Sequence, residues 1–521
     1  MNPQKLENKK LFEKNYKKFG LDLNLFVSLS SAILVILFIL FTLIFPTNSA
    51  DFFSEIKLFV TDKFNWLFVF VINFSLFFIL LLAVSKFGKI VIGGPGTKRE
   101  FNNFAWYSML FSAGIGIGIF FFGIAEPIYH LNIPSSLASN PSYDPFKIMY
   151  LHWGIHAWVV YSVVAIVLGY FAYNKGLPLS IRSVFYPVLK DKIYGFWGNV
   201  IDTIAVLSVL FGLSTSLGLG ARQINAGLNY VFDVPFNNTI QLVLILIITF
   251  IATLSVVSGI SKGIKILSEL NIRLSFVFLG LILVIGPTFH IISVFLNSTS
   301  LYFVDFFKIG LFTATNDSDI NWQSAWTIFY WAWWFSWSPF VGMFIARISK
   351  GRTIRQIVIG TVLIPSLVCF FTMTILGATG LSINAANNGV METAVANDLS
   401  TTLFVMINHL FTSNTLQIIF ALFAVIVIVL FFVTSSDSGS LIVDFLTSGG
   451  KTNTPKTQRV FWAIMEGLIA ASVLVLGGVK ALTTLQALVI IMGLPFSIMF
   501  LVMIYSLIKQ LLIDDKKNSS S

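Results

Sequence analysis

Long apolar runs alternate with short polar segments along almost the whole chain. Each run is close to or longer than the roughly 20 residues that an α-helix needs to cross the hydrocarbon core of a bilayer. The pattern therefore predicts an all-α polytopic membrane protein with twelve transmembrane helices. The predicted helices cover approximately residues 25–46, 65–85, 104–130, 148–174, 198–230, 238–258, 273–296, 322–346, 356–380, 415–440, 457–478 and 482–508.

The composition indicates the same class of protein. Of the 521 residues, 56% are hydrophobic and only 11% are charged, whereas a soluble domain carries about 25% charged residues. Too few polar side chains are present to cover a water-facing surface, which excludes a soluble globular protein. The one cysteine, Cys369, lies in an apolar run, so no intramolecular disulfide can form and no redox role is indicated.

Positive charges are distributed unevenly between alternate loops. With the N-terminus placed in the cytoplasm, the inside segments contain 27 of the 33 Lys and Arg residues. Membrane proteins show this excess on the cytoplasmic side, so the net charge of +10 reflects topology and not a nucleic-acid partner. We expect a multi-pass protein of the plasma (inner) membrane with both termini in the cytoplasm. The remaining positive residues are Lys57, Lys63, Lys147, Arg222, Lys308 and Lys480.

The pattern also divides the chain into segments. The N-terminal region is polar for too long to be a standard signal peptide, so we expect the first apolar run to remain as a membrane helix. An outer linker mixes aromatic and polar residues, as an interfacial amphipathic helix does, although an ordered loop fits its composition equally well. The predicted segments are a cytoplasmic tail (1–24), two extra helices with their loop (25–103), a first five-helix repeat (104–296), the extracellular amphipathic linker (297–321), a second five-helix repeat (322–508) and a short cytoplasmic tail (509–521).

Two of the predicted helices contain residues that disrupt a helix. The third contains the glycine run SAGIGIG, residues 112–118, and the eighth contains Ser338-Pro339 after a tryptophan cluster. Gly and Pro weaken a helix interior by about 1 and 3 kcal/mol respectively. A pair of interrupted helices, one in each half, is typical of transporters built from an inverted repeat, although glycines also permit close helix packing. We therefore predict a break in both helices.

Aromatic residues gather in the fourth and eighth helices. The segment LHWGIHAWVVY contains Trp153, Trp158 and Tyr161, and FYWAWWFSWSPF contains four tryptophans, including Trp334 and Trp337. An aromatic face attracts a quaternary ammonium group by on the order of 0.5–2 kcal/mol per contact. Tryptophans also form belts at membrane interfaces, but Trp334 and Trp337 lie well inside their helix. The two sets are therefore candidates for a box that binds a cation.

Few acidic residues fall inside the predicted helices, and none lies in the glycine run. A purely cationic substrate would favour an anion beside it, whereas a zwitterion brings its own carboxylate, which the N–H groups of a broken helix can bind. The uncharged glycine run and the aromatic sets together favour a zwitterion such as glycine betaine over choline. The acidic candidates are Glu126, Asp202, Asp437, Asp444 and Glu466.

A coupling ion would need oxygen ligands. The tenth helix ends in FFVTSSDSGS, where the hydroxyls of Thr434 and Ser435 suit Na⁺, although Ser and Thr in membrane helices more often bond to their own backbone carbonyls. His152 and His156 lie one turn apart, but no third metal ligand accompanies them and no catalytic cluster is evident. We expect a transporter and not an enzyme, with no cofactor besides the coupling ion.

These motifs resemble those of a known family. The segment FYWAWWFSWSPFVGMFIARISKGRTIRQ is similar to the signature of the betaine/carnitine/choline transporters, and SAGIGIGIFFFGIAEP and LHWGIHAWVVY resemble their third and fourth helices. The similarity extends over essentially all twelve predicted helices. It implies a leucine-transporter-type fold of two inverted five-helix repeats preceded by two extra helices, commonly assembled as a homotrimer in the lipid membrane.

The resemblance also implies roles for individual residues. Proton-coupled choline members tend to carry an Asp in the glycine run, which Gly118 does not supply here. The implied aromatic box consists of Trp153, Trp158, Tyr161 and Trp334, with Trp337 in the site or on the path to it. The implied carboxylate contacts are the backbone of Ile117 and Gly118, with Ser216. The implied Na⁺ ligands are carbonyls of Ser112, Ile115 and Phe431 and the hydroxyls of Thr434 and Ser435.

Two features depart from the family pattern. A second sodium site would need two threonines where this chain has Val209 and Leu213, unless Ser214 or Thr215 substitutes. The C-terminal segment is short and of mixed charge, unlike the long basic extension of osmosensing members. The number of coupled Na⁺ ions and osmotic regulation therefore stay open.

The sequence as a whole predicts a Na⁺ symporter that takes up glycine betaine as an osmoprotectant by alternating access. Choline, carnitine or dimethylsulfoniopropionate would fit the same box, with H⁺ symport or exchange as alternative mechanisms. A channel would need a continuous polar lining, whereas the sequence shows isolated polar points. A non-transporting membrane sensor is the other alternative from a different class.

Overall fold

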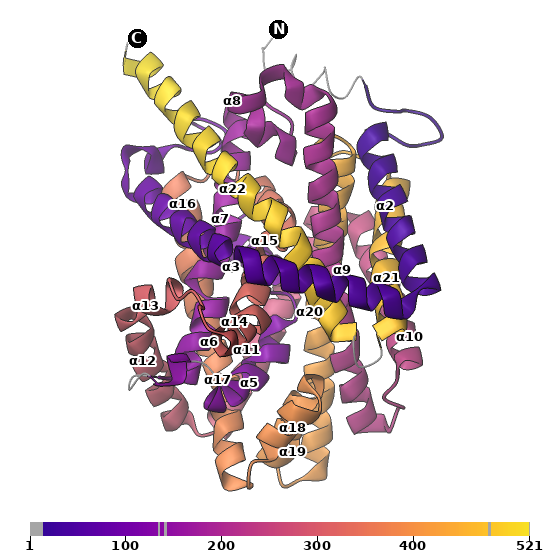
Figure 1. Cartoon of the computed structure of the whole chain (residues 1–521), viewed down its shortest axis with the longest axis vertical. Helices are drawn as coiled ribbons and strands as arrows, with labels where there is room; N and C mark the ends of the chain where they lie inside the picture. Colours follow the sequence, from indigo (N-terminus) through magenta and orange to yellow (C-terminus); the bar gives the residue numbers. More distant parts are fainter. Residues whose placement is uncertain (1–13, 134–135, 140–142, 478–480, 520–521) are drawn as a thin grey trace.

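The computed structural model describes residues 14–133, 136–139, 143–477 and 481–519. These residues form helices joined by short turns, and no β-strand occurs among them. The helices make an elongated bundle, with the first and last described residues at the same end, the upper one in Figure 1. The prediction of an all-helical chain is confirmed, and the placement of both ends in the cytoplasm stays a prediction.

The predicted apolar runs correspond to the principal helices, several of which are divided. These helices are α2 (Leu25–Ile44), α3 (Pro46–Val84), α4 (Asn103–Ile115), α5 (Gly118–Tyr129), α6 (Pro145–Trp153), α7 (Ile155–Gly169), α9 (Phe196–Phe232), α10 (Asn238–Ser258), α11 (Lys265–Ile285), α15 (Thr327–Ile348), α16 (Ile354–Val358), α17 (Ile364–Ala386), α20 (Asn414–Thr447), α21 (Lys456–Gly477) and α22 (Ala481–Ser519). The connecting helices are η1 (Lys86–Lys89), η2 (His130–Asn132), η3 (Ser136–Ser139), η4 (Tyr170–Asn174), η5 (Ile181–Phe185), α8 (Tyr186–Leu189), η6 (Lys190–Tyr194), η7 (Ile260–Ile264), α12 (Thr288–Val304), α13 (Phe306–Gly310), α14 (Asp317–Ala325), η8 (Ile359–Leu363), α18 (Val390–Asn397), η9 (Leu399–Thr401) and α19 (Thr402–Leu410).

The described part of the chain contains nine helices that are long and apolar enough to cross a membrane, when α6 with α7 and α16 with α17 are each counted as one. The bent pair of α4 and α5 would make a tenth. The helices α15 and α21 each have 22 residues but are not among these ten. The molecule is therefore a polytopic helical membrane protein, and the count of twelve spans remains a prediction.

The predicted seventh helix, residues 273–296, is wrong in its boundaries. Helix α11 ends at Ile285 and α12 begins at Thr288, so Gly286-Pro287 divides the run. Pro287 has no N–H to donate to the carbonyl of Leu283, and the hydroxyl of Thr288 donates to that oxygen instead, at 2.6 Å. The predicted linker is consequently helical from its start, because it begins inside α12 and continues through α13 and α14.

The predicted break in the third helix is confirmed. Helices α4 and α5 meet at an angle of 56°, and the turn is made at Gly116, with φ 57° and ψ −141°. A side chain strongly disfavours this conformation, whereas glycine adopts it readily. The glycine run therefore separates two helices with different directions.

The predicted break at Ser338-Pro339 is wrong, because α15 runs continuously through it. Pro339 cannot donate to the carbonyl of Phe335, four residues earlier. The hydroxyl of Ser338 donates to that carbonyl at 2.7 Å and replaces the missing backbone hydrogen bond. Breaks were expected in two helices, and that pairing favoured an inverted repeat. Only the third predicted helix is broken, so the inverted repeat rests on the family resemblance alone.

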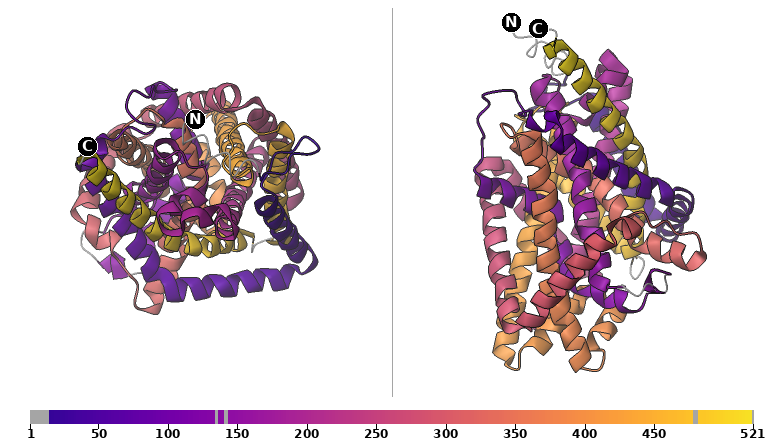
Figure 2. Two further views of the ribbon diagram at one scale, coloured as in Figure 1. Left: turned by 90° about the horizontal axis from the view of Figure 1, so that it is seen from above. Right: turned by 90° about the vertical axis from the view of Figure 1, so that its left-hand side faces the viewer.

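Helix α15 lies in the interior of the bundle. All of its residues except Arg347 are buried, and it packs along α7, α9 and α22. Helices α2 and α3 instead follow the rim, as Figure 2 shows from above. They expose large apolar side chains such as Phe70 and Leu81, as lipid-facing helices do.

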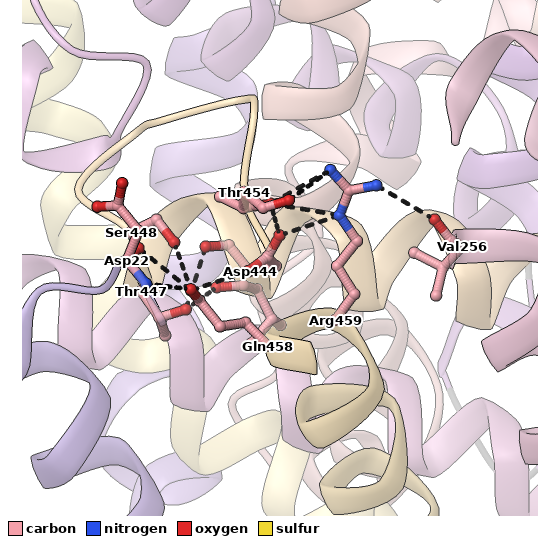
Figure 3. Close-up of polar contacts among 9 residues, drawn as sticks. Asp22, Val256, Asp444, Thr447, Ser448, Thr454, Gln458 and Arg459 are labelled. Carbon is pink, nitrogen blue, oxygen red and sulfur yellow. Dashed lines mark hydrogen bonds and ion pairs between the residues drawn. The ribbon is translucent and has the colours of Figure 1, made fainter. Parts of the chain in front are cut away.

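A polar cluster joins distant segments at the end of the bundle where the chain ends lie (Figure 3). The backbone N–H of Asp22 donates to Oε1 of Gln458 at 2.6 Å, and Nε2 of Gln458 donates to the hydroxyl of Ser448 at 3.0 Å. Burial opposes ionisation of Asp22, but hydrogen bonds from Lys451 and Asn15 outweigh it, so the pKa of this carboxyl lies below its usual range. The segment before α2 is thereby tied to the loop between α20 and α21.

We expect Gly116→Ala to lower the free energy of unfolding by about 1–3 kcal/mol, the usual cost of a strained backbone conformation. The added Cβ would also lie 2.9 Å from Cη2 of Trp337. Thermal unfolding of the purified protein in detergent measures the change. Gly94→Ala is the matched control, because Gly94 also has positive φ but a Cβ added there would have no atom within 4 Å. Equal losses in the two variants would rule out a contribution from the Trp337 contact.

Candidate functional site

Four aromatic rings from three helices meet inside the bundle. Trp153 ends α6, Trp158 and Tyr161 lie on α7, and Trp334 lies on α15. The ring centroids of Trp334 are 5.0 Å from Trp153 and 6.2 Å from Tyr161, and those of Trp158 and Tyr161 are 5.6 Å apart. All three pairs are edge-to-face and all four side chains are buried. The structure thus brings together the four rings that the sequence suggested, while their binding of a cation stays a prediction.

The glycine run packs directly against these tryptophans. A Cβ atom added at Gly114 would lie 2.7 Å from Cη2 of Trp158, and one added at Gly118 would lie 2.1 Å from Cη2 of Trp153. A contact shorter than 3.0 Å is too close for a real Cβ, so alanine would displace either ring. The sequence left helix packing and a broken helix as separate explanations of the glycines. The structure shows both, because the same run turns the chain and leaves room for the rings.

Trp337 adjoins the box through an edge-to-face contact with Trp334. Its ring centroid is 6.4 Å from that of Trp334, and its six-membered ring approaches Gly116 while its five-membered ring approaches Gly212 on α9. Trp333 stacks on Trp334 at 5.3 Å, and Trp331 stacks on His156 at 5.6 Å. Of the four tryptophans in the cluster, Trp331 is the one whose ring packs away from the box.

The predicted carboxylate contacts lie at the start of α5. Ile117 is the residue before this helix, and no side chain caps its first turn. The first N–H groups of any helix lack intrahelical acceptors and attract negative charge. Ser216, on α9, has a buried hydroxyl with no hydrogen-bond partner among the described residues. These groups are suited to an anionic group.

The predicted Na⁺ ligands come from the end of α4 and the middle of α20. The hydroxyl of Ser435 lies 3.4 Å from the carbonyl oxygen of Ser112, so two members of the set meet across the helices. The hydroxyl of Thr434 donates to the carbonyls of Leu430 and Phe431, at 2.9 and 3.1 Å. This is the ordinary back-bonded state of Thr in a membrane helix. The carbonyl of the fifth member, Ile115, is among the last four of α4, which lack intrahelical donors.

The second sodium site has no oxygen ligands at the two expected positions. Val209 and Leu213 are buried, and a Cβ added at Gly439 on α20 would lie 2.1 Å from Cδ1 of Leu213. The hydroxyls of Ser214 and Thr215 donate to carbonyls of their own helix, at 2.7 and 3.1 Å. Both hydroxyls are therefore back-bonded, as that of Thr434 is, and a substitution of the missing threonines by Ser214 or Thr215 stays a prediction.

Glu126 is the site residue whose role the sequence did not reveal. It lies on α5 and is fully buried. Its Oε2 accepts hydrogen bonds from Nε1 of Trp153 and from the hydroxyl of Tyr330, both at 2.8 Å. Its Oε1 lies 2.5 Å from Nδ1 of His152, and the backbone carbonyl of His152 accepts from Nε1 of Trp334 at 2.9 Å. One carboxylate thus holds one box tryptophan directly and, through His152, is linked to a second.

The other acidic candidates divide into two groups. Asp202 forms an ion pair with Arg182 at 2.5 Å, and Asp444 one with Arg459 at 3.4 Å, so each has its counter-charge within the protein. Asp437 and Glu466 form no ion pair among the described residues. No group of three or more His, Cys, Asp or Glu side chains in the described chain is arranged to hold a metal ion. His152 faces Glu126 and His156 lies between aromatic rings, so these two histidines do not converge.

Comparison with known proteins identifies similar chains over nearly the full length. The model of the "betaine/carnitine/choline family transporter" matches residues 26–516. Glycine betaine transporter 1 of Vibrio parahaemolyticus is 41% identical, over 95% of this chain and 95% of its own. Glycine betaine transporter OpuD of Bacillus subtilis is 40% identical, over 91% of each chain. A transporter of V. parahaemolyticus named for glycine betaine, proline and choline is 38% identical, over 95% of this chain and 91% of its own.

We expect Glu126→Gln to destabilise the protein by about 1–3 kcal/mol, the cost of leaving a buried donor unsatisfied. An amide has a single acceptor oxygen. If that oxygen keeps the bonds from Trp153 and Tyr330, the NH₂ group faces Nδ1 of His152, and this contact is lost unless the imidazole ring changes tautomer. Thermal unfolding and the tryptophan emission maximum would report the change. Glu100→Gln is the control, since Glu100 is an exposed acid paired with Arg347, and such pairs contribute only about 0–1 kcal/mol. An unchanged melting temperature in Glu126→Gln would show that this carboxylate does not hold the rings.

Proposed function

Because the chain belongs to the betaine/carnitine/choline family of transporters, we propose that it imports glycine betaine by symport with Na⁺. The protein is a transporter and not an enzyme. The proposal includes alternating access through twelve helices in two inverted repeats, assembly as a homotrimer, and both termini in the cytoplasm. Uptake of an osmoprotectant across the plasma membrane would be its cellular role.

The observation that carries the proposal is the aromatic box against the glycine run. Trp153, Trp158, Tyr161 and Trp334 are in ring contact and buried. Aromatic faces in a dry site bind a trimethylammonium group, which donates no hydrogen bond, better than they bind a hydrated ion. The glycines of the run permit the close approach of the rings to the chain where α5 begins. The cationic and anionic ends of a small zwitterion would therefore be held by neighbouring elements.

The glycine run supports a zwitterion over a bare cation. Residues 112–118 carry no ionisable side chain, and the start of α5 offers backbone N–H groups to a carboxylate. Glu126 is the nearest acid in sequence, and its oxygens are already engaged by Trp153, Tyr330 and His152. It therefore supports the box and does not act as a counter-ion for a choline-like substrate.

The coupling proposal places one Na⁺ between α4 and α20. Its ligands would be carbonyls of the broken α4 and hydroxyls of α20, a combination of oxygens that holds Na⁺ in transporters with interrupted helices. The contact of Ser435 with Ser112 supports this placement. Binding would require the hydroxyl hydrogen of Thr434 to turn away, so that its oxygen can face the ion. The five ligands would be Ser112, Ile115, Phe431, Thr434 and Ser435.

Uptake of radiolabelled glycine betaine into proteoliposomes tests the function directly. We expect accumulation driven by an inward Na⁺ gradient and little driven by an H⁺ gradient. Unlabelled choline, carnitine, proline and dimethylsulfoniopropionate as competitors define the substrate. Two results would contradict the proposal. One is uptake that does not depend on the Na⁺ gradient, and the other is stronger inhibition by unlabelled choline than by unlabelled glycine betaine.

We expect Trp334→Leu to raise the apparent KM for glycine betaine by roughly 2- to 30-fold, which corresponds to one cation–π contact of about 0.5–2 kcal/mol. Trp331→Leu is the matched control, because Trp331 is equally buried on the same helix but stacks on His156. Its KM should stay close to that of the wild type. Equal shifts in the two variants would mean that Trp334 acts only through packing.

We expect Thr434→Ala to raise the Na⁺ concentration for half-maximal uptake by roughly five- to tenfold, on the scale of about 1–1.5 kcal/mol for one neutral polar contact. The matched control is Thr447→Ala on the same helix. Its hydroxyl is back-bonded in the same way, to carbonyls at 2.9 and 3.1 Å. Initial rates of uptake over a series of Na⁺ concentrations give the half-maximal Na⁺ concentration of each variant. An unchanged value in Thr434→Ala would show that Thr434 is not a Na⁺ ligand.

A further inference from the structure

A cavity with charged walls lies at the end of the bundle opposite the chain ends, where Figure 1 shows α18 and α19. The proposed topology makes this the extracellular end. The cavity has a volume of about 230 Å³ and is bounded by α5, α9 and the segment from α18 into η9. Its polar lining residues are Arg222, Asn397 and Asp398, and its apolar ones include Phe121 and Leu219. The space is therefore suited to a small molecule that carries charge.

Arg222 and Asp398 form an ion pair in the wall of this cavity. Nη2 of Arg222 donates to Oδ2 of Asp398 at 2.6 Å, and Nε donates to the same oxygen at 3.0 Å. Only 29% of the arginine side chain and 15% of the aspartate side chain are exposed. Nη1 of Arg222 has no hydrogen-bond acceptor in the described part of the chain. The guanidinium therefore keeps a donor group for a further anion.

Asp398 does not depend on Arg222 alone. Its Oδ1 also accepts hydrogen bonds from the backbone N–H of Ser400 at 2.9 Å and from the hydroxyl of Ser400 at 2.7 Å. A carboxylate that keeps two donors loses its arginine partner at a smaller cost than a carboxylate left with none. The pair can consequently open for a ligand while the aspartate stays in place.

The cavity adjoins the positions proposed for the carboxylate of the substrate. A Cβ added at Gly220, two residues before the arginine on α9, would lie 3.5 Å from Cδ1 of Ile117. Phe121, in the wall of the cavity, follows Gly118 by three residues on α5, which is about one helical turn. The cavity therefore lies about one turn of α5 outward of the proposed carboxylate contacts.

We propose that Arg222 and Asp398 form an outer binding site for a zwitterion, which the substrate occupies before it reaches the aromatic box. The carboxylate of the substrate would bind Arg222, and its ammonium group would lie near Asp398. An ion pair is electrostatically complementary to a zwitterion, because each end of the ligand replaces one member of the pair and no charge is left unbalanced. A guanidinium also presents the planar donor geometry that binds a carboxylate through two hydrogen bonds.

The same pair disfavours a bare cation. Choline has no carboxylate, so it would neutralise Asp398 and leave Arg222 without a counter-charge in a partly dehydrated site. The guanidinium would also repel the positive charge of choline. The outer site would therefore select a zwitterion ahead of the box, whose rings recognise the ammonium group that both molecules share. The inference rests on the proposed function, because it names the step by which that substrate enters.

Kinetics of glycine betaine uptake into proteoliposomes test the proposal with the full-length protein. We expect Arg222→Gln to raise the apparent KM for glycine betaine by roughly tenfold, the lower end of the effect of a hydrogen bond to a charged group, with kcat little changed. Choline should inhibit Arg222→Gln at least as strongly as it inhibits the wild type. Arg347→Gln is the matched control, since Arg347 forms a similar two-bond pair with Glu100, and its KM should stay close to that of the wild type.

A second variant separates ligand binding from a purely structural tie between α9 and the end of α18. Asp398→Asn also breaks the ion pair but retains the positive charge of Arg222. We expect its rise in KM for glycine betaine to be several times smaller than the rise in Arg222→Gln. Equal rises in the two variants would show that the pair only holds the helices together, and this result would overturn the proposal.

Two further outcomes would overturn it. One is an unchanged KM for glycine betaine in Arg222→Gln, and the other is inhibition by choline that weakens in this variant as much as glycine betaine binding does. Should Arg222→Gln fail to fold, Arg222→Lys keeps the charge without the two-bond geometry. A severalfold rise in KM for glycine betaine is then expected, and an unchanged KM would contradict the site.

These outcomes are distinct from failure of the proposed function. A wild-type protein that takes up no glycine betaine would refute the proposed substrate and with it this entry step. Na⁺-driven uptake by the wild type, together with the same KM in Arg222→Gln, would refute the outer site alone.

Discussion

A polar group inside this bundle depends on a partner within the protein, because hydrocarbon offers no hydrogen bonds in exchange. Two prolines inside predicted helices, Pro287 and Pro339, show how this works. The carbonyls that Pro287 and Pro339 leave free accept from the hydroxyls of Thr288 and Ser338, one residue away in each case. In the first case the helix ends and in the second it continues. A proline therefore leaves one backbone carbonyl without its usual N–H donor. The neighbouring residues determine whether the helix continues or ends there.

The same constraint organises the aromatic box. Indole N–H groups are donors that bring no acceptor with them, so a buried tryptophan is fixed in its orientation where an acceptor lies opposite its N–H. Glu126 and the backbone of His152 supply them to Trp153 and Trp334. Each ring is thereby held before any ligand arrives, and preorganised contacts avoid an ordering cost on binding. The acid that fixes the rings is unavailable to a ligand, which is why a buried carboxylate so near the box is compatible with a zwitterion.

Glycine has two separate effects where α4 meets α5. At Gly116 it permits a backbone conformation that other residues disfavour, and at Gly114 and Gly118 it leaves the volume that tryptophan rings fill. The turn exposes helix termini, and the missing side chains admit the rings to the same place. A polar atom that stays unpartnered among the described residues, the hydroxyl of Ser216, is the one that we propose for the carboxylate of the substrate.

The amino-acid sequence by itself determined the class of protein, the approximate positions of the helices, the break at the glycine run and the membership of the aromatic set. These follow from local quantities: run length, loop charge, the conformational freedom of glycine and a distinctive tryptophan motif. The tertiary structure decided the role of Glu126, the continuity of α15 through Pro339 and the end of α11 at Ile285. Each of these depends on which donor or charge lies within a few ångströms. That distance depends on how helices far apart in the chain pack together. The hydrophobic periodicity of one helix gives no information about it.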